Sequence, residues 1–254
     1  MTEASLTCSG QKRYGDYGFY APGVMLGLSF AGLGVLVLSI LAFTLLQESL
    51  LWLGRVIGAL LLFAFCGGVL QTTYIFWSLW LGRFRECERL LDLVELQGDE
   101  LVLDVGCGRG LILNAAARRL TKGKAIGIDI WSQRDQCSNR PEETLRNARR
   151  EGVETRVEIL DGDARQMPFE DQHFEVVTSS LLLHNLHVPE DRRQVLNEIM
   201  RVLKPGGRFA ILDFQHVKEY ATVLKQRGAL DVRIIGPHYL IFPGVWIVVG
   251  YKSK

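Results

Sequence analysis

Two long apolar stretches occupy the first third of the chain. Val24 to Leu46 contains apolar and small residues with no charged side chain, and Val56 to Leu81 is a second stretch of the same kind. In a helix, about 20 such residues cross the hydrocarbon core of a bilayer at about 1.5 Å per residue. A short polar break, Gln47-Glu48-Ser49, separates them. The pattern therefore predicts a transmembrane helical hairpin over residues 22–82, preceded by a segment of residues 1–21.

Other interpretations of these stretches fit less well. A cleaved signal peptide is shorter, starts earlier and is not followed by a second apolar stretch. Helices buried in a soluble core rarely lack charge on every face. Small residues recur in both stretches, which allows close helix packing in lipid or reflects the general frequency of glycine in membrane helices; they are Gly23, Gly27, Ala31, Gly34, Gly58, Gly67 and Gly68.

The basic residues predict the orientation of the hairpin. Lys12 and Arg13 precede the first span, and Arg83, Arg85 and Arg89 follow the second, whereas the connecting loop has only Arg55. Because basic residues are retained on the cytoplasmic side, both termini and the rest of the chain are expected to be cytoplasmic.

Residues 83–98 connect the hairpin to a region of ordinary charge density. Phe84, Cys87, Leu91 and Val94 recur on one helical face. Such an amphipathic helix lies at a membrane surface or covers a globular domain. The polar sequence Gln97-Gly98-Asp99-Glu100 then ends the pattern.

From residue 99 to 254, strand-like and helical patterns alternate. Strands are predicted at Leu101–Val105, Ala125–Ile130, Val157–Leu160, Phe174–Ser179, Arg208–Phe214, Asp231–Ile235 and Val245–Tyr251. Helices are predicted at Leu111–Leu120, Glu142–Glu151, Glu190–Leu203 and Val217–Arg227. This alternation predicts an α/β domain whose mostly parallel sheet has helices on both faces. Ligands bind such sheets at the carboxyl ends of the strands.

A glycine-rich turn follows the first predicted strand. Gly106, Gly108 and Gly110 form G-x-G-x-G, two residues after Asp104. The spacing differs from the G-x-G-x-x-G of dinucleotide sites, which disfavours a nicotinamide oxidoreductase. Asp129 ends the second predicted strand about 20 residues later, where a carboxylate can accept hydrogen bonds from a ribose diol. Asp163 follows the third strand and is placed to accept from the amine of a purine; the alternative is a local turn built on Asp161-Gly162-Asp163.

Five motifs in this order resemble one family. They are LDVGCGRG, GIDI, GDARQMPF, FEVVTSSLLLHN and RVLKPGGRFAILD. Residues 99–254 are similar to class I S-adenosylmethionine-dependent methyltransferases of the type 11 group, which includes quinone and sterol methyltransferases. The resemblance implies a seven-stranded Rossmann-like sheet with its last strand antiparallel, and Gly236-Pro237 and Pro243-Gly244 fit the final hairpin.

The resemblance also implies roles for individual residues around the cofactor S-adenosylmethionine. The glycines Gly106, Gly108 and Gly110 approach its methionine portion, with Asp104 near its amino group. Asp129 holds the ribose, and Ile130 or Trp131 packs against the adenine. Asp163 and Ala164 meet the adenine edge, and Ser179 or Ser180 lies beneath the sulfonium. The polar loop from Trp131 to Pro141 forms a lid or is simply solvated.

The acceptor is less defined than the donor. The family's Asp/Asn-Pro-Pro-Tyr pattern is absent after the fourth strand, and the net charge is +1, so a nucleic acid is not expected as substrate. Methyl transfer needs a general base only when the acceptor loses a proton. His184 is the best-placed candidate, ahead of His187, Asp213 and His238; its alternative role is a structural hydrogen bond.

The predicted function is a membrane-anchored methyltransferase acting on a small or lipophilic acceptor, such as a quinone precursor or a lipid. A non-catalytic membrane scaffold or sensor that binds S-adenosylmethionine is the alternative. The five cysteines are scattered without zinc spacing, so no metal site is predicted.

Overall fold

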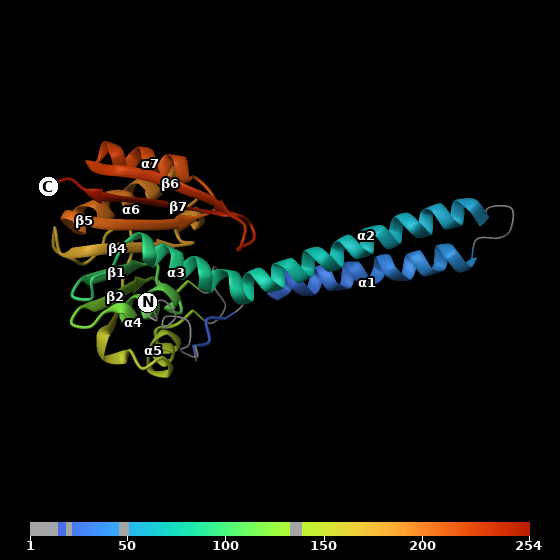
Figure 1. Ribbon diagram of the computed structural model, residues 1–254, viewed down its shortest axis with the longest axis horizontal. Helices are drawn as coiled ribbons and strands as arrows, with labels where there is room; N and C mark the ends of the chain where they lie inside the picture. The colour runs from blue at the N-terminus through green and yellow to red at the C-terminus, as the bar shows by residue number, and fades with distance from the viewer. Residues whose placement is uncertain (1–14, 19–21, 46–50, 133–138) are drawn as a thin grey trace, which may run out of the picture. The chain divides into compact units, whose positions relative to one another are not determined.

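The computed structural model describes residues 15–18, 22–45, 51–132 and 139–254, which form two compact units (Figure 1). The globular unit contains Glu86–His238 and Gly244–Lys254 together with residues 15–18. The helical unit contains the described residues of Phe19–Arg85 and also Tyr239–Pro243. The division after Arg85 falls inside the predicted connecting segment of residues 83–98.

A seven-stranded mixed sheet forms the centre of the globular unit, in the order β3-β2-β1-β4-β5-β7-β6. The first five strands are parallel, and β7 is antiparallel to both β5 and β6. This confirms the predicted fold, including the antiparallel last strand. The strands are β1 (Leu101–Val105), β2 (Lys124–Asp129), β3 (Val157–Asp161), β4 (Phe174–Ser180), β5 (Leu203–Asp213), β6 (Ala229–His238) and β7 (Val245–Lys252).

The helices of the globular unit pack on this sheet, which explains the continuous apolar strands. β1 and β2 are buried along nearly their whole length, as expected for strands covered on both faces. The helices are α3 (Arg83–Leu93), α4 (Leu111–Arg119), α5 (Pro141–Arg150), α6 (Pro189–Val202) and α7 (Val217–Gln226). Short 3₁₀ turns lie at η3 (Glu154–Arg156) and η4 (Leu183–Asn185).

Sequence signals at the helix ends explain where α6 lies. Pro189 occupies the first turn with Glu190 and Asp191, and Arg201 lies in the last turn. Proline suits the first helical position because the missing N–H would have no partner there. Acids near the N-terminus and a base near the C-terminus complement the helix dipole.

The predicted start of the fifth strand is wrong by five residues. β5 begins at Leu203, whereas the sequence predicted a helix up to Leu203 and a strand from Arg208. Leu203 pairs with Phe174, and Arg208 pairs with Val176, so a register shift accommodates the extra residues. Such irregularities insert residues into one strand without ending the ladder of hydrogen bonds. The strand start was missed because Pro205 and Gly206 are residues typical of a turn.

Helix α3 covers the globular unit, which decides between the two predicted roles of this segment. Cys87, Leu90 and Leu91 are buried in α3. The Cys87 thiol lies 3.7 Å from the carbonyl oxygen of Leu111 at the start of α4. Its apolar face is therefore occupied by protein.

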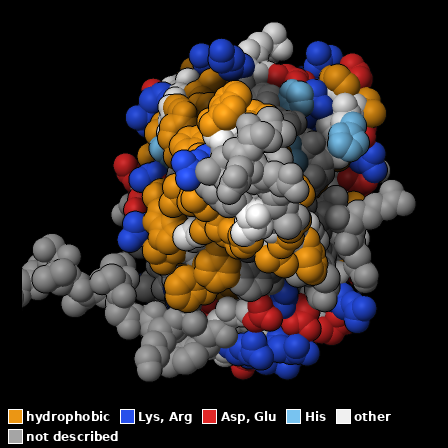
Figure 2. All heavy atoms as spheres, turned by 90° about the vertical axis from the view of Figure 1, so that its right-hand side faces the viewer, with side chains coloured by type: hydrophobic (Ala, Val, Ile, Leu, Met, Phe, Trp, Pro, Cys, Tyr) orange, Lys and Arg blue, Asp and Glu red, His pale blue; other side chains and the backbone are white. Residues whose placement is uncertain are grey.

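The helical unit contains α1 (Pro22–Leu45), α2 (Leu51–Trp77) and the π-helical turn η2 (Ser78–Gly82). Helices α1 and α2 contact each other, and the buried Ser39 hydroxyl donates to the Gly58 carbonyl at 2.9 Å. Figure 2 shows mostly hydrophobic side chains on the helical unit nearest the viewer. Described members of this exposed set include Phe30, Leu38, Leu60, Phe63 and Leu70.

One helix among the described residues, Trp52–Leu93, is long and apolar enough to cross a membrane by length and composition. Only 11% of its most apolar window is buried, whereas the core helix of a soluble protein is mostly buried. In α1 the corresponding described run, Phe30–Ala42, is shorter. A two-span hairpin therefore remains a prediction.

Most of the small residues do not serve close packing of the two helices. A Cβ placed on Gly27, Gly34, Gly67 or Gly68 would meet no other described atom within 4 Å. Of the two interpretations of these small residues, close packing of the helices is therefore not supported at these four glycines.

Candidate functional site

The glycine loop between β1 and α4 needs glycine at all three motif positions. Gly106, Gly108 and Gly110 have φ angles of 72°, 48° and 83°, a region that other residues rarely adopt. A Cβ on Gly106 would approach the Leu182 side chain to 2.8 Å, and one on Gly110 would approach Thr144 to the same distance. The loop thus exposes its backbone at the carboxyl end of β1.

Asp129, at the end of β2, is hydrogen-bonded to this loop. Its Oδ2 accepts from the Gly108 N–H at 2.8 Å. Its Oδ1 accepts from the Trp131 N–H at 2.6 Å and from the Asn139 amide at 3.2 Å. Each carboxylate oxygen has two lone-pair sites, so Asp129 is oriented by protein donors and retains capacity for a ligand.

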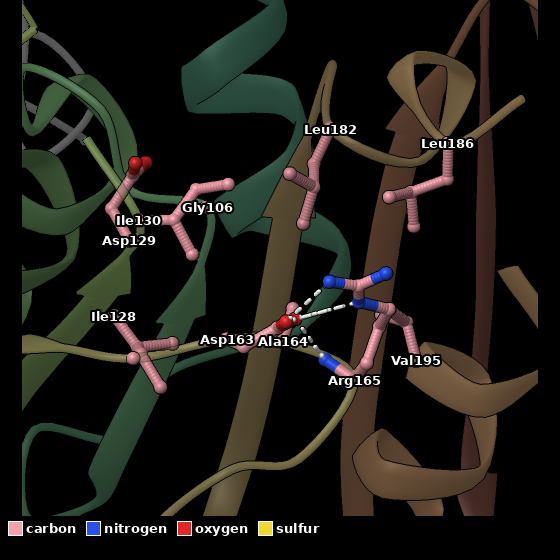
Figure 3. A pocket seen from close by; sticks show the side chains of 11 residues that line it. Gly106, Ile128, Asp129, Ile130, Asp163, Ala164, Arg165, Leu182, Leu186 and Val195 are labelled. Carbon is pink, nitrogen blue, oxygen red and sulfur yellow. Dashed lines mark hydrogen bonds and ion pairs between the residues drawn. The ribbon is translucent and has the colours of Figure 1, made fainter. Parts of the chain in front are cut away.

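A pocket opens beside the glycine loop at the carboxyl ends of the strands (Figure 3). The lining residues are Gly106, Ile128, Asp129, Ile130, Gly162, Asp163, Ala164, Arg165, Leu182, Leu186 and Val195. The pocket therefore brings together five of the predicted cofactor residues: Gly106, Asp129, Ile130, Asp163 and Ala164.

The other predicted cofactor residues do not line this pocket. Asp104 and Ser179 are buried, and the Ser179 hydroxyl donates to the Val105 carbonyl at 2.9 Å. The Trp131 indole N–H donates to Asp161 on β3, so Ile130 is the residue of this pair that faces the pocket. Gly108, Gly110 and Ser180 also lie outside the lining set. Most of the predicted lid, residues 133–138, lies outside the described residues.

Arg165 is a pocket residue that the sequence patterns did not reveal. Its Nη2 lies 2.6 Å from Asp163 Oδ2 (Figure 3). Its Nη1 lies 3.0 Å from Asp191 Oδ2. The hydrogen bonds from Arg165 lower the pKa of Asp163. Asp163 is thus ionised and fixed at the pocket wall, and its predicted contact with adenine remains a prediction.

Asp104 lies beneath the loop in a fully buried position next to Thr178. The Thr178 hydroxyl donates to Asp104 Oδ1 at 3.1 Å. Burial raises the pKa of Asp104 to about 7, and the nearby Asp129 charge adds to this effect. The folded protein therefore keeps a proton on Asp104 at pH values where the unfolded chain loses it.

This pKa predicts a pH-dependent stability that Asp104→Asn removes. Because the folded pKa is raised, the stabilisation is complete below pH about 4 and is lost as the pH rises through about 7. From pH 5 to 7 the wild-type free energy of unfolding should fall by roughly 2–3 kcal/mol from this group. Denaturant titrations at several pH values measure this change in the free energy of unfolding, and the variant Glu170→Gln, at an exposed position, is the control. If the free energy of unfolding of Asp104→Asn fell with pH as steeply as that of the wild type, the raised pKa would not belong to Asp104.

His184 and Asp213 form a pair at the ends of β4 and β5. His184 Nδ1 lies 2.9 Å from Asp213 Oδ1, and Asp213 is fully buried. Asp213 also accepts from the backbone N–H groups of Phe214 at 2.8 Å and His184 at 3.1 Å. Since these groups can only donate, both carboxylate oxygens act as acceptors, and Nδ1 carries the hydrogen. In the neutral imidazole, Nε2 then has the free lone pair.

The other histidine candidates are placed differently. His187 is exposed. His238 Nδ1 lies 2.9 Å from Oε2 of the fully buried Glu86, whose Oε1 also binds Arg89 at 2.7 Å. The structure thus places Asp213 as the partner of His184, and it places His238 in a separate cluster with α3.

Residues 15–18, the N-terminal clasp, bind the globular unit beside the glycine loop. Tyr17 is buried, and its hydroxyl contacts Glu151 and accepts from the Asn114 amide at 3.2 Å. Asn147 binds both backbone groups of Asp16, at 2.8 and 2.9 Å, and also donates to the Arg109 carbonyl at 2.9 Å. The clasp therefore fastens α4 and α5 around the loop.

Tyr17→Ala is expected to lower the free energy of unfolding by about 3 kcal/mol, because it leaves a cavity between α4 and α5. Tyr17→Phe keeps the ring and loses only the hydroxyl contacts, so a loss of about 1 kcal/mol is expected. Thermal or denaturant unfolding of both variants measures the difference. Equal stability of Tyr17→Ala and wild type would show that the clasp is dispensable.

Comparison with known proteins agrees with this site. Residues 103–211 match the family model described as a methyltransferase domain. A 2-phytyl-1,4-beta-naphthoquinone methyltransferase of Arabidopsis thaliana is 32% identical over 52% of this chain and 48% of its own. A demethylmenaquinone methyltransferase of Lactobacillus johnsonii is 32% identical over 47% and 46% of the two chains. The chain spans about half the length of these curated relatives.

Solved structures share the fold at low sequence identity. An S-adenosylmethionine-dependent methyltransferase from Aquifex aeolicus has a TM-score of 0.52 and 22% identity, over 65% of this chain and 88% of that one. The cyclase SpnF has a TM-score of 0.56 and 19% identity, over 67% and 81%. Since the fold also occurs in a cyclase, the solved structures show the fold alone. Residues 103–211 are therefore similar to methyltransferase domains, and the curated relatives that match this part of the chain are named as methyltransferases.

Proposed function

We propose that the protein methylates a small lipophilic acceptor at the cytoplasmic surface of a membrane, using S-adenosylmethionine as donor. The observation that carries the catalytic part is the position of the His184–Asp213 pair. Leu182 and Leu186 line the pocket, and His184 lies between them in the chain. The cofactor pocket and an oriented base thus share one edge of the sheet.

The pocket residues fit the cofactor. Ile128, Ile130 and Leu182 supply apolar walls for a purine, and the glycine loop lets the backbone approach a ligand closely. Asn139 is buried beside Asp129, and its Oδ1 has no hydrogen-bond partner among the described residues. A ribose hydroxyl would satisfy this acceptor. We therefore assign Asp129 and Asn139 to the ribose and the backbone of Gly106 to the methionine portion.

The bound cofactor supplies an electrophilic methyl group on a sulfonium. The chain's contribution is positioning, exclusion of water and movement of a proton. His184 Nε2 would accept the proton that an acceptor hydroxyl or acidic carbon loses when it takes the methyl group; the methyl–sulfur bond would break at the same time, and its electron pair would leave with the neutral thioether product. Asp213 holds the Nδ1–H and stabilises the imidazolium that forms. Holding the acceptor in line near the methyl group contributes a large part of the rate.

Two observations support a lipophilic acceptor and a membrane location. Relatives named for naphthoquinone and menaquinone substrates match this domain. The helical unit exposes large hydrophobic side chains along α1 and α2, and α2 carries Arg55 as its one charged residue. Burying these side chains in lipid would remove them from water at about 25 cal/mol per Å². Arg83, Arg85 and Arg89 after α2 support a cytoplasmic position of the catalytic domain.

Turnover tests the proposal. The full chain in lipid vesicles is incubated with S-adenosylmethionine and either the lipid extract or the water-soluble extract of a membrane preparation. Accumulation of S-adenosylhomocysteine with the lipid extract is expected. Turnover with the water-soluble extract alone would overturn the lipophilic acceptor. Binding of S-adenosylmethionine without turnover in either extract would favour a cofactor-binding scaffold.

The location has a separate test. Alkaline carbonate releases peripheral proteins from membranes, whereas a spanning protein stays in the pellet. The full chain is expected in the pellet, and a protease added outside sealed, right-side-out cells should leave the catalytic domain intact. Release by carbonate would contradict the membrane-spanning hairpin without affecting the assignment of the reaction.

A further inference from the structure

The turn between β6 and β7 belongs to the helical unit, although both of its strands belong to the sheet. Residues Tyr239–Pro243 cluster with α2 and η2. The Phe242 N–H donates to the Ser78 hydroxyl oxygen at 2.6 Å, and the Tyr74 hydroxyl donates to the Tyr239 carbonyl at 2.5 Å. The Tyr74 and Phe242 rings meet edge to face at 6.0 Å. Three contacts therefore fix the turn on the end of α2.

Two features of η2 are adapted to this contact. Ser78 is fully buried and begins the π-helical turn, a deviation that often marks functional positions in helices. Gly82 ends it, and a Cβ there would lie 1.7 Å from the Leu240 carbonyl oxygen. Only glycine allows the backbone of the turn to approach the helix so closely.

The turn presents aromatic side chains outward while its backbone is held. Tyr239 is 67% exposed and Phe242 is 45% exposed. Phe76 near the end of α2 and Trp80 in η2 are also exposed, and their ring centroids lie 6.3 Å apart in a stacked arrangement. Aromatic rings collected at one end of an apolar helix, directly before Arg83 and Arg85, are typical of the boundary between lipid and water.

We propose that Tyr239–Pro243 is a lipid-contacting loop that inserts Tyr239 and Phe242 into the membrane interface at the level of Trp80. This inference rests on the proposed membrane anchoring. Lipid is favoured over a protein partner because the loop continues the exposed apolar surface of α2 and lies where that surface gives way to basic residues. The loop adds a membrane contact to those of the two helices.

The loop also connects the membrane to the catalytic edge through a short length of chain. β6 ends at His238, one residue before the loop, and β7 begins at Val245, two residues after it. In the sheet, Trp246 pairs with Asp213, the residue that orients His184. The chain therefore leads directly from the loop into the strand that pairs with the strand of Asp213.

Site-specific fluorescence in vesicles tests the loop. An environment-sensitive fluorescent amino acid is placed at one position of the full chain, which is reconstituted in vesicles of phosphatidylcholine and phosphatidylglycerol with or without nitroxide-labelled lipid. The positions are Phe242 in the loop, the 80% exposed Phe63 on α2 as the lipid reference, and the exposed Lys225 on α7 as the aqueous reference. Aqueous iodide is the second quencher.

Nitroxide-labelled lipid is expected to quench the fluorescence of the probe at Phe242, as it does at Phe63. The probe at Lys225 is expected to be quenched by iodide alone. Quenching at Phe63 but not at Phe242 would overturn the loop contact and leave the membrane anchor intact. A Phe242 probe shielded from both quenchers would indicate a protein partner instead. Absence of lipid quenching at Phe63 would contradict the anchor itself.

Gly82→Ala provides an internal check, because its methyl group would displace the Leu240 carbonyl. Lipid quenching at Phe242 is expected to fall in this variant and to remain unchanged at Phe63. Unchanged quenching at Phe242 would show that the contact with η2 does not hold the loop at the membrane. Circular dichroism and the S-adenosylmethionine affinity of the variant confirm that the rest of the chain is folded.

Discussion

Replacing His184 with asparagine is expected to lower the rate of methyl transfer by about 10²–10⁴-fold and to leave the affinity for S-adenosylmethionine almost unchanged. The imidazole follows β4 at the carboxyl edge of the sheet, and its Nδ1 is held by the buried Asp213. Asparagine retains a polar group but cannot accept the acceptor's proton at Nε2. Single-turnover measurements with a methyl-acceptor extract, together with cofactor titration, separate the two quantities.

Asp213→Asn should lower the rate of methyl transfer by nearly as much as His184→Asn. The asparagine NH₂ group can donate to His184 Nδ1, which would favour the imidazole tautomer in which Nε2 is protonated and cannot accept a proton. His187→Asn is the matched control, because that side chain is exposed three residues away and its change should have little effect. Full activity in His184→Asn would show that methyl transfer here does not need His184 as a base. An equal loss in His187→Asn would show that the effect is not specific to His184, which would also contradict the assignment of His184 as the base.

Asp129→Ala is expected to weaken S-adenosylmethionine binding by roughly 10- to 100-fold, since hydrogen bonds to a charged group contribute about 1.5–3 kcal/mol each. Part of this loss comes from the protein, because Asp129 also accepts from Gly108 and Trp131. Calorimetric titration of wild type and variant measures the sum of the lost ligand contact and the lost support of the loop.

A cofactor analogue separates the ribose contact from the support of the loop. Wild type should bind the 2′-deoxyribose analogue of S-adenosylhomocysteine more weakly than the parent compound, and Asp129→Ala should not distinguish the two. Asp161→Asn is the control, because Asp161 pairs with Asp129 in register on the neighbouring strand but does not line the pocket. Equal discrimination in wild type and Asp129→Ala would mean that Asp129 acts only through the loop.

The order of the strands, the glycines and the acids along the chain depends on neighbouring residues, so it could be predicted from the sequence. β1 is a continuous apolar run except for Asp104, and α6 has its own periodicity and end signals. The position of Asp129 follows from the rule that the second parallel strand ends next to the first. The pocket confirms that Gly106, Asp129 and Asp163 are brought together, and their contacts with the cofactor remain predictions.

Contacts between distant parts of the chain were not predictable in the same way. His184 and Asp213 were separate candidates, and their pairing depends on β4 lying next to β5. Tyr17 packs against residues nearly 100 or more positions later, and no periodicity marks such a contact. Arg165 resembled an ordinary surface residue until its pairs with Asp163 and Asp191 were seen.

By itself, the sequence determined the two regions of the chain, the α/β class and the positions of the acids at the strand ends, and its family resemblance indicated the methyl donor. These features depend on hydrophobic periodicity and on short motifs, both of which involve residues that are close together in the sequence. Only the tertiary structure decided which histidine is oriented by a buried carboxylate, how the N-terminal clasp holds the glycine loop, and why glycine stands at position 82. Those features arise where separate elements meet, so their energies depend on contacts that no local stretch of residues contains.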